Sequence, residues 1–193
     1  MNVLIIPENP RHDQHVLLPI VQAMFTEIGK PHANVRVCQD SGLGGIAQAT
    51  DWECVERIIN RFKNMVHVFL LLVDRDGEAG RKQCLRNLEE RAAGVLGQNR
   101  FFFAEHAHQE IEVWLLAGLE LPVQWLWNDI RAEVHVKEKY FETLAANRKV
   151  DDMPSGGRTT LAREASRNYS RIRTLCNELS ALELRIVESF NCR

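Results

Sequence analysis

The stretch that decides the fold is Val66-His-Val-Phe-Leu-Leu-Leu-Val73, which runs directly into Asp74-Arg-Asp76. It is apolar apart from His67, and a short continuous apolar run is typical of a strand that is buried on both faces of a parallel sheet. An earlier run, Val3-Leu-Ile-Ile6, has the same character and is ended by Pro7. We therefore predict two parallel strands in the middle of a sheet, each followed closely by carboxylates.

Around these two strands, apolar residues recur at helical spacing or in short strand-like runs. Pro19 lies inside the first helical pattern and predicts a kink or the start of a new helix. Strands that alternate with helices indicate an α/β fold with a mainly parallel, Rossmann-like sheet flanked by helices. The expected helices cover residues 13–28, 52–62 and 80–96, and the further strands cover residues 34–38 and 101–104.

Beyond Glu110 the pattern changes to helices alone. A flexible joint at residues 154–157 precedes what we expect to be one long helix from about Thr160. Further helices are expected over residues 111–119, 124–131 and 137–146. We predict an α/β domain over residues 1–119 and a helical C-terminal extension over residues 120–193 that packs on it.

Composition restricts the classes of protein to which the chain belongs. Its 193 residues are 45% hydrophobic and 26% charged, as in an ordinary globular protein. No apolar run reaches the roughly 20 residues that cross a bilayer, and the N-terminus lacks the features of a signal peptide. We expect a cytoplasmic protein without membrane association and with its five cysteines reduced. A net charge of −2 means that any contact with nucleic acid must come from a local patch.

Three carboxylates follow the two buried strands. Glu8 lies two residues after the first strand, and Asp74 and Asp76 follow the second. Ligands of an open parallel sheet bind at the carboxyl ends of its strands, so these side chains meet if the strands are neighbours. In an extended segment, residues 74 and 76 point to the same side. Carboxylates suit Mg²⁺, with Mn²⁺ as the alternative, although an Asp-x-Asp-Gly sequence is also typical of a turn.

A further acidic pair, Glu110 and Glu112, opens the helix after the strand at residues 101–104. Acidic residues in a first helical turn interact favourably with the helix dipole, which is one explanation of this pair. However, Glu112 lies among Ile111, Val113 and Trp114, where the surroundings are more apolar than a solvated helix start requires. We therefore count Glu110 and Glu112 as candidate metal ligands.

These motifs together resemble the Toprim domain of topoisomerases, primases and overcoming-lysogenization-defect nucleases. The resemblance rests on a Glu after the first strand, an Asp-x-Asp after a hydrophobic strand, and the α/β order between them. The segment Gln109-Glu-Ile-Glu-Val-Trp-Leu-Leu-Ala-Gly118 is similar to a Glu-x-Trp-Leu-Leu-Ala-Asp stretch in small stand-alone Toprim-like proteins, some of them linked to phage defence. The resemblance covers about residues 1–119.

The resemblance implies roles for particular residues. Glu8 would act as a general acid/base or metal ligand, and Asp74 and Asp76 would hold Mg²⁺. In the nuclease branch of the family, further acids and a lysine complete a two-metal site. Those roles would fall on Asp13, on Glu110 or Glu112, and on Lys137 or Lys139. The chain departs from the family at Asn9-Pro10, which stand where a Gly usually follows the first Glu.

Basic, histidine and tryptophan side chains supply further candidates. Arg163, Arg167 and Arg171 are spaced to form one stripe on the expected long helix, with Arg158 nearby, and guanidinium groups fit phosphate oxygens. A solvated helix face explains the same stripe. Lys137 could neutralise charge on a reacting phosphate. We expect Trp114, Trp125 and Trp127 to pack in the core. Histidines that lie near the expected strand ends are His12, His15, His106 and His108.

These features predict a magnesium-dependent phosphoester hydrolase, most simply a nuclease of DNA or RNA, with Glu8, Asp74, Asp76 and Lys137 as catalytic residues. One alternative is a non-catalytic Toprim-like module that works with a partner protein in a defence or toxin system. Another is an α/β response-type domain that accepts a phosphoryl group on Asp74. We also expect the protein to form a homo-oligomer.

Overall fold

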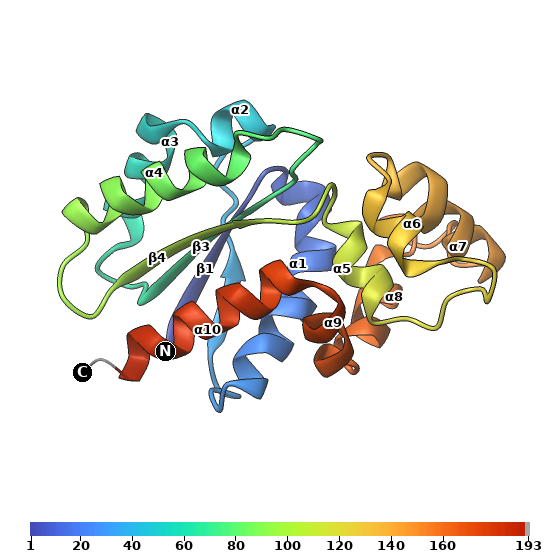
Figure 1. Ribbon diagram of the computed structural model, residues 1–193. Helices are drawn as coiled ribbons and strands as arrows, with labels where there is room; N and C mark the ends of the chain where they lie inside the picture. The colour runs from blue at the N-terminus through green and yellow to red at the C-terminus, as the bar shows by residue number, and fades with distance from the viewer. Residues whose placement is uncertain (192–193) are drawn as a thin grey trace.

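The computed structural model describes residues 1–191 and contains one sheet of four parallel strands in the order β2-β1-β3-β4 (Figure 1). The register places Ile5 of β1 opposite Leu70 of β3, and Leu70 opposite Phe103 of β4. The strands are β1 (Asn2–Pro7), β2 (Asn34–Val37), β3 (Val68–Val73) and β4 (Phe101–His106). The predicted α/β class is thus confirmed, and the two apolar runs form neighbouring central strands.

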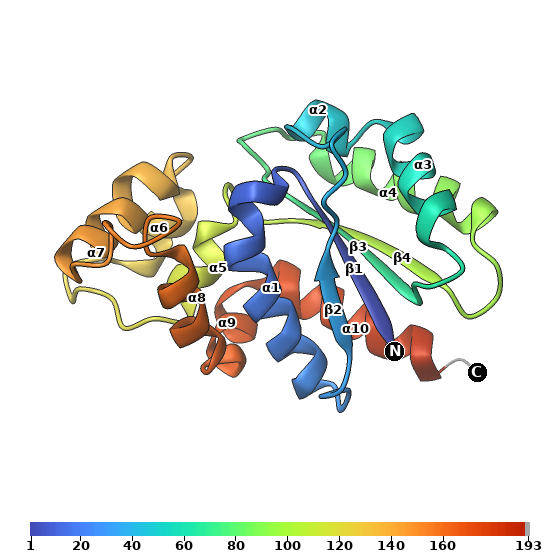
Figure 2. The same cartoon turned by 180° about the vertical axis from the view of Figure 1, so that it is seen from behind.

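Side chains alternate between the two faces of the sheet, as the period of a strand requires. Ile5 and Leu70 point into a core that also contains helix α1 (Pro10–Glu27). Ile6 and Leu71 point into a second core under three other helices. These are α2 (Ile46–Ala49), α3 (Trp52–Phe62) and α4 (Arg81–Val95). Figures 1 and 2 show α3 and α4 on one face of the sheet, with α1 and the C-terminal helix α10 (Asn177–Asn191) on the other.

The junction between β1 and α1 explains why Asn9 and Pro10 occupy these two positions. Asn9 caps the first turn of α1, because its side chain accepts a hydrogen bond from the Arg11 amide at 3.2 Å. Pro10 is the first helical residue, where a missing N–H costs nothing. The expectation that a new helix starts at Pro19 is wrong, since α1 continues through Pro19, with residues on both sides of it buried against the sheet.

After β4 the chain is helical; the helices between residues 127 and 166 lie beyond the carboxyl ends of the strands, and α10 returns along one face of the sheet (Figure 1). The expected long helix from Thr160 is wrong, because the backbone leaves helical geometry at Asn168 and again at Cys176. The two breaks turn the chain so that Ala165, Ile172 and Leu182 all face the core. The elements are α5 (Glu112–Ala117), α6 (Trp127–Ala132), a π-helical turn η1 (Lys137–Phe141), α7 (Glu142–Asn147), α8 (Arg158–Ser166), α9 (Tyr169–Leu175) and α10.

The C-terminal helices share one continuous core with α1 and the sheet. Leu161 of α8, Ile172 of α9 and Leu182 of α10 belong to the same cluster of buried residues as Ile20 of α1. A β-carbon added to Gly118 would lie 2.5 Å from the Ala165 carbonyl oxygen, so α5 and α8 approach closely at this glycine. The predicted extension therefore packs on the α/β unit, while its standing as a separate domain stays a prediction.

Two further sequence-based expectations concern membranes and cysteines. Within residues 1–191, no helix is long and apolar enough to cross a bilayer. Cys38, Cys54, Cys84 and Cys176 are free thiols, and Cys192 lies outside the described residues.

Candidate acidic active site

A cavity of about 290 Å³ opens where the segments after β1, β3 and β4 meet. Five carboxylates, one lysine and one arginine contribute to its wall, and most of them were candidates from the sequence. The residues that line the cavity are Glu8, Asn9, His12, Asp13, Asp74, Glu110, Ile111, Glu112, Lys137 and Arg158. The adjacency of β1 and β3 thus brings Glu8 and Asp74 together, as expected.

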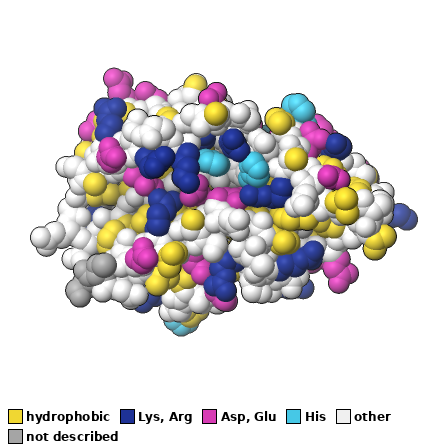
Figure 3. Space-filling view, viewed as in Figure 1, with side chains coloured by type: hydrophobic (Ala, Val, Ile, Leu, Met, Phe, Trp, Pro, Cys, Tyr) yellow, Lys and Arg dark blue, Asp and Glu magenta, His cyan; other side chains and the backbone are white. Residues whose placement is uncertain are grey.

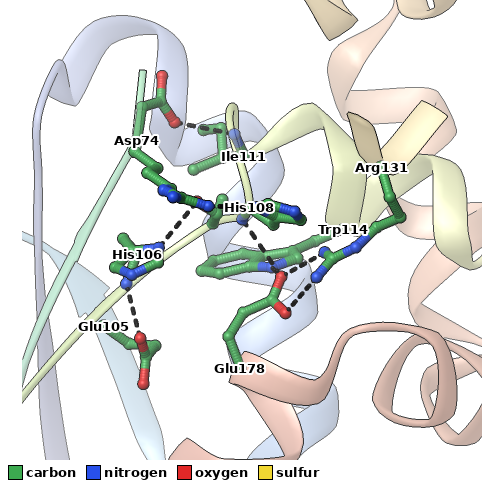
Figure 4. Close-up of polar contacts among 10 residues, drawn as sticks. Asp74, Glu105, His106, His108, Ile111, Trp114, Arg131 and Glu178 are labelled. Atoms are coloured by element: carbon green, nitrogen blue, oxygen red, sulfur yellow. Dashed lines mark hydrogen bonds and ion pairs between the residues drawn. The ribbon is translucent and has the colours of Figure 1, made fainter. Parts of the chain in front are cut away.

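Backbone N–H groups hold three of the carboxylates in place. The Asn9 amide donates to Asp13 Oδ2 at 2.6 Å, in the first turn of α1. The Ile111 amide donates to Asp74 Oδ1 at 2.8 Å (Figure 4). The Lys137 amide donates to Glu110 Oε2 at 2.7 Å. Asp13 is therefore positioned by the start of its own helix, whereas Asp74 and Glu110 are positioned by segments that are distant in the sequence.

One buried ion pair lies in the cavity wall. Arg158 donates from Nε at 3.0 Å and from Nη2 at 2.8 Å to Glu112 Oε1. Both side chains are largely buried, with 12% of Arg158 and 7% of Glu112 exposed, and the guanidinium also lies 4.8 Å from the centre of the Phe141 ring. Arg158 therefore balances one carboxylate and leaves the others without a comparable partner among residues 1–191.

The surplus of buried negative charge changes the pKa values of the acids. Burial, followed by repulsion from Glu112 and Glu8, raises the pKa of Asp74 to about 9. Burial also raises the pKa of Asp13 to about 7, with Glu112 and Glu8 contributing. The pKa values of Glu8 and Glu110 are raised mainly by burial as well. In this cavity the charged forms of the acids are unfavourable unless positive charge is added.

The donor chemistry of the cavity suits a hard divalent cation. Carboxylate oxygens are the ligands that Mg²⁺ prefers, and Glu8 Oε2 is buried without a hydrogen-bond partner among the described residues. Within residues 1–191, however, no three His, Cys, Asp or Glu side chains are grouped closely enough to hold a metal ion as they stand. A cation would therefore have to displace protons and draw the carboxylates together.

Asp76 lies in a different backbone geometry from the expected one. β3 ends at Val73, and Asp76 adopts a φ of 53° in an exposed turn, so residues 74 and 76 do not belong to one extended segment. The turn is held by Gln109, whose side chain accepts from the Gly77 amide at 2.9 Å. Asp76 is not among the cavity residues, although its charge contributes to the raised pKa of Glu8. Its role as a ligand stays a prediction.

The arginine stripe is not formed as predicted. Arg163 lies on α8, Arg167 is the residue at which α8 ends, and Arg171 lies on α9. Arg171 donates from Nη1 to the Leu119 carbonyl oxygen at 2.7 Å. Because the chain turns between α8 and α9, the i, i+4, i+8 spacing does not place these arginines on one helix face.

The candidate lysines, histidines and tryptophans lie in three kinds of place: in the cavity wall, in or against the core, or in hydrogen bonds and ion pairs outside the cavity. Lys137 lines the cavity, whereas Lys139 pairs with Glu133 outside it. Of the four histidines, His12 lines the cavity, and His15 forms a 2.9 Å hydrogen bond with Thr159 Oγ1. The prediction that the tryptophans pack in the core is confirmed for Trp114, which is fully buried, whereas Trp125 and Trp127 are partly buried at the edge of the same core.

A polar network beside the cavity was missed from the sequence. Glu178 of α10 accepts from Trp114 Nε1 at 2.9 Å and from Arg131 Nη1 and Nη2 at 2.7 and 2.9 Å (Figure 4). It also accepts from the His108 amide at 3.3 Å. Glu178 thereby ties α10 to α5, to α6 and to the segment that carries Glu110. No local pattern marks it, because its partners lie 47 to 70 residues away along the chain.

No protein-family model, curated protein or solved structure matches this chain. The Toprim resemblance therefore stays a prediction.

The pKa of Asp74 predicts how stability depends on pH. Its pKa rises from 3.8 to about 9 on folding, so the contribution of this group to stability is full below pH 3.8 and is lost as the pH approaches 9. Burial lowers the pKa values of His106 and His108 below 6.5. These two groups make stability rise with pH, but only below about pH 7. Between pH 7 and 9, the free energy of unfolding of the metal-free protein should therefore fall by up to about 1.4 kcal/mol per pH unit.

Urea denaturation at a series of pH values, with a chelator present, measures this slope. The Asp74→Asn variant removes the titrating group and should flatten the slope. A free energy of unfolding that stays constant or increases from pH 7 to pH 9 in the unchanged protein would contradict the prediction.

Proposed function

We propose that the protein is a Mg²⁺-dependent phosphoester hydrolase, most simply a nuclease of DNA or RNA, and that the acidic cavity is its active site. One observation carries the proposal: five carboxylates, with Lys137 and Arg158, line a single cavity at the carboxyl ends of two neighbouring parallel strands. Ligands of open α/β sheets bind in this position, and the surplus of buried acids favours a divalent cation.

Glu8 and Asp74 are the proposed inner ligands, because Glu8 Oε2 is unpartnered and Asp74 has one oxygen beyond its bond to the Ile111 amide. Glu110 or Glu112 would complete the set, and Asp76 would approach from the mouth of the cavity. A bound Mg²⁺ or Mn²⁺ supplies Lewis acidity and an activated water.

The remaining cavity residues have distinct roles in the proposal. Arg158 holds Glu112 through two hydrogen bonds and so fixes one wall. Asp13 has a pKa of about 7, so its carboxyl group can both accept and donate a proton at neutral pH. The atom that would do so is Oδ1, because the Asn9 backbone amide binds Oδ2. The Lys137 side chain is 39% exposed, and its ammonium group lies 3.6 Å from Glu138 Oε1. This is a weak pairing that a phosphate oxygen can replace.

Calorimetric titration with Mg²⁺ and Mn²⁺ tests the metal site directly. We expect binding with release of protons, because the acids hold protons in the metal-free protein at neutral pH, and an affinity that increases from pH 6 to pH 8. We also expect cleavage of labelled DNA or RNA only when a divalent cation is present. A protein that binds neither cation would exclude the proposal. A tightly co-purifying protein partner without metal dependence would support the non-catalytic alternative.

A further inference from the structure

Three basic side chains lie between the end of β3 and the first turn of α4, beside the acidic cavity. Arg75 follows β3, and Arg81 and Lys82 begin α4. Within residues 1–191, no carboxylate oxygen lies within 4.0 Å of the charged nitrogens of these side chains. By contrast, Arg131 and Arg158, which border the same region, each pair with a glutamate whose side chain is at most 10% exposed. The first three cations therefore form no close ion pair with the described residues.

Arg81 and Lys82 lie at the positive end of the α4 dipole, which repels cations. The first turn of α4 carries no acidic residue, although Glu78, before the helix, accepts from the Gly80 backbone amide at 3.1 Å. Arg81 Nε is also buried without a hydrogen-bond partner among the described residues. Buried donors are normally paired, so an unpaired one calls for a partner that the chain itself does not supply.

The positive charge extends from β1 to β4 along the carboxyl edge of the sheet. Arg81 lies close enough to Glu8 to act on its pKa, which the positive charge lowers. The charge of Lys82 likewise acts to lower the pKa values of Glu105 and His106 at the end of β4. Arg75 Nη1 lies 3.2 Å from His108 Nδ1. Figure 3 shows Lys and Arg side chains gathered around histidines on one face of the molecule, with acidic groups between them.

The histidines report the same local potential. The pKa values of His106 and His108 are lowered first by burial and then by nearby cations, namely Arg75 with Lys82 for His106 and Arg131 with Arg75 for His108. His106 Nδ1 lies 3.1 Å from the Ala107 carbonyl oxygen, which leaves Nε2 available to a ligand.

We propose that Arg75, Arg81 and Lys82 form a phosphate-binding surface for a polynucleotide strand. This inference rests on the proposed function, because the surface would present one phosphodiester of the bound strand to the acidic cavity. The cations are spread over a loop and the start of α4 instead of converging on one pocket. That spacing suits successive phosphates of a chain better than a single nucleotide, and guanidinium groups bind phosphate oxygens in a bidentate manner.

The test measures binding without cleavage. Fluorescence anisotropy of a fluorescein-labelled oligothymidylate, with a chelator present, compares the unchanged protein with the double variant Arg75→Ala/Lys82→Ala. We expect binding to weaken at least about tenfold and the salt dependence of the logarithm of the binding constant to fall by about 1.4, since each phosphate contact on a single strand contributes about 0.7. Circular dichroism would check that the variant is folded.

A matched control removes the same charge elsewhere. The double variant Arg163→Ala/Arg167→Ala changes two exposed arginines of the α8 region and should bind the oligonucleotide as the unchanged protein does. The proposal is overturned if this control loses binding while Arg75→Ala/Lys82→Ala retains it. Competition by thymidine monophosphate as strong as that by the chain, at equal phosphate concentration, would also overturn the assignment to a polynucleotide.

The two proposals fail in different ways. If Arg75→Ala/Lys82→Ala binds the oligonucleotide normally, the surface is wrong, and metal binding by the cavity is unaffected. If the unchanged protein binds neither Mg²⁺ nor Mn²⁺, the active-site proposal fails, while oligonucleotide binding in the presence of a chelator still decides whether the surface is correct.

Discussion

Replacing Asp74 with asparagine is expected to lower metal-dependent phosphoester cleavage by at least about 100-fold while raising the stability of the metal-free protein. The loss follows because a catalytic metal contributes several kcal/mol of transition-state stabilisation, and each 1.4 kcal/mol corresponds to a factor of ten in rate. Asparagine keeps an oxygen that can accept from the Ile111 amide, as Asp74 Oδ1 does at 2.8 Å. The substitution therefore changes charge with little change in shape.

The stability of the Asp74→Asn variant should rise although its activity falls, because Asp74 is buried among other acids. Its pKa of about 9 means that ionising it at lower pH opposes folding, and a neutral amide avoids that cost. Thermal or urea unfolding at pH 8 with a chelator measures the gain, and a cleavage assay with Mg²⁺ measures the loss. Such opposite effects are typical of residues kept for function at the expense of stability.

Two further variants sharpen the Asp74 experiment. Asp152→Asn changes an exposed acid in the loop before α8 and should alter neither cleavage nor stability. Asp76→Asn changes the exposed residue at φ 53°, a conformation that asparagine tolerates, and should reduce metal affinity less than Asp74→Asn does. Undiminished cleavage by Asp74→Asn would show that the cavity is not the active site.

Replacing Glu178 with alanine is expected to lower the free energy of unfolding by about 3–5 kcal/mol, because it breaks a buried ion pair and leaves its partners unsatisfied. Arg131, only 18% exposed, would lose two hydrogen bonds. Trp114 Nε1 and the His108 amide would lose their acceptor. Burial of Glu178 opposes its ionisation, but the hydrogen bonds and charge of Arg131 hold its pKa below the ordinary value.

Urea denaturation of Glu178→Ala and of a control on the same helix measures this cost. Glu188→Ala removes an exposed acid of α10 and should change the free energy of unfolding by less than about 0.5 kcal/mol. Glu178→Gln retains acceptors for the indole and amide donors but removes the charge, so its cost should lie between those of the other two variants. Equal stability of Glu178→Ala and Glu188→Ala would contradict the assigned network.

The strands and most helices could be predicted from the sequence because their signals are local. The apolar runs that became β1 and β3 are buried on both faces, and α3 and α4 have apolar residues on one helical face. The breaks at Asn168 and Cys176 were missed because neither position carries Gly or Pro. Three short helices that each bury one face have nearly the same apolar spacing as a single long helix.

The candidate site was only partly predictable, because several of its contacts join residues that are far apart in the sequence. Glu8 and Asp74 meet because β1 and β3 are neighbours, which follows from the general rule for parallel sheets. The partnership of Arg158 with Glu112 joins residues 46 positions apart, and it depends on how α8 packs against α5. The prediction for the geometry of Asp76 failed because strand alternation was extended past Val73, into a turn that Gln109 holds from a distant part of the chain.

The attachment of Glu178 to the segment that carries Glu110 has a consequence for biosynthesis. The cavity wall is drawn from residues between Glu8 and Arg158, and one of the braces of that wall comes from residue 178. During translation, the strands leave the ribosome long before this brace does. A chain still being synthesised therefore has its acids but not their final support, and any hydrolytic activity should appear only once residue 178 has emerged and α10 has folded.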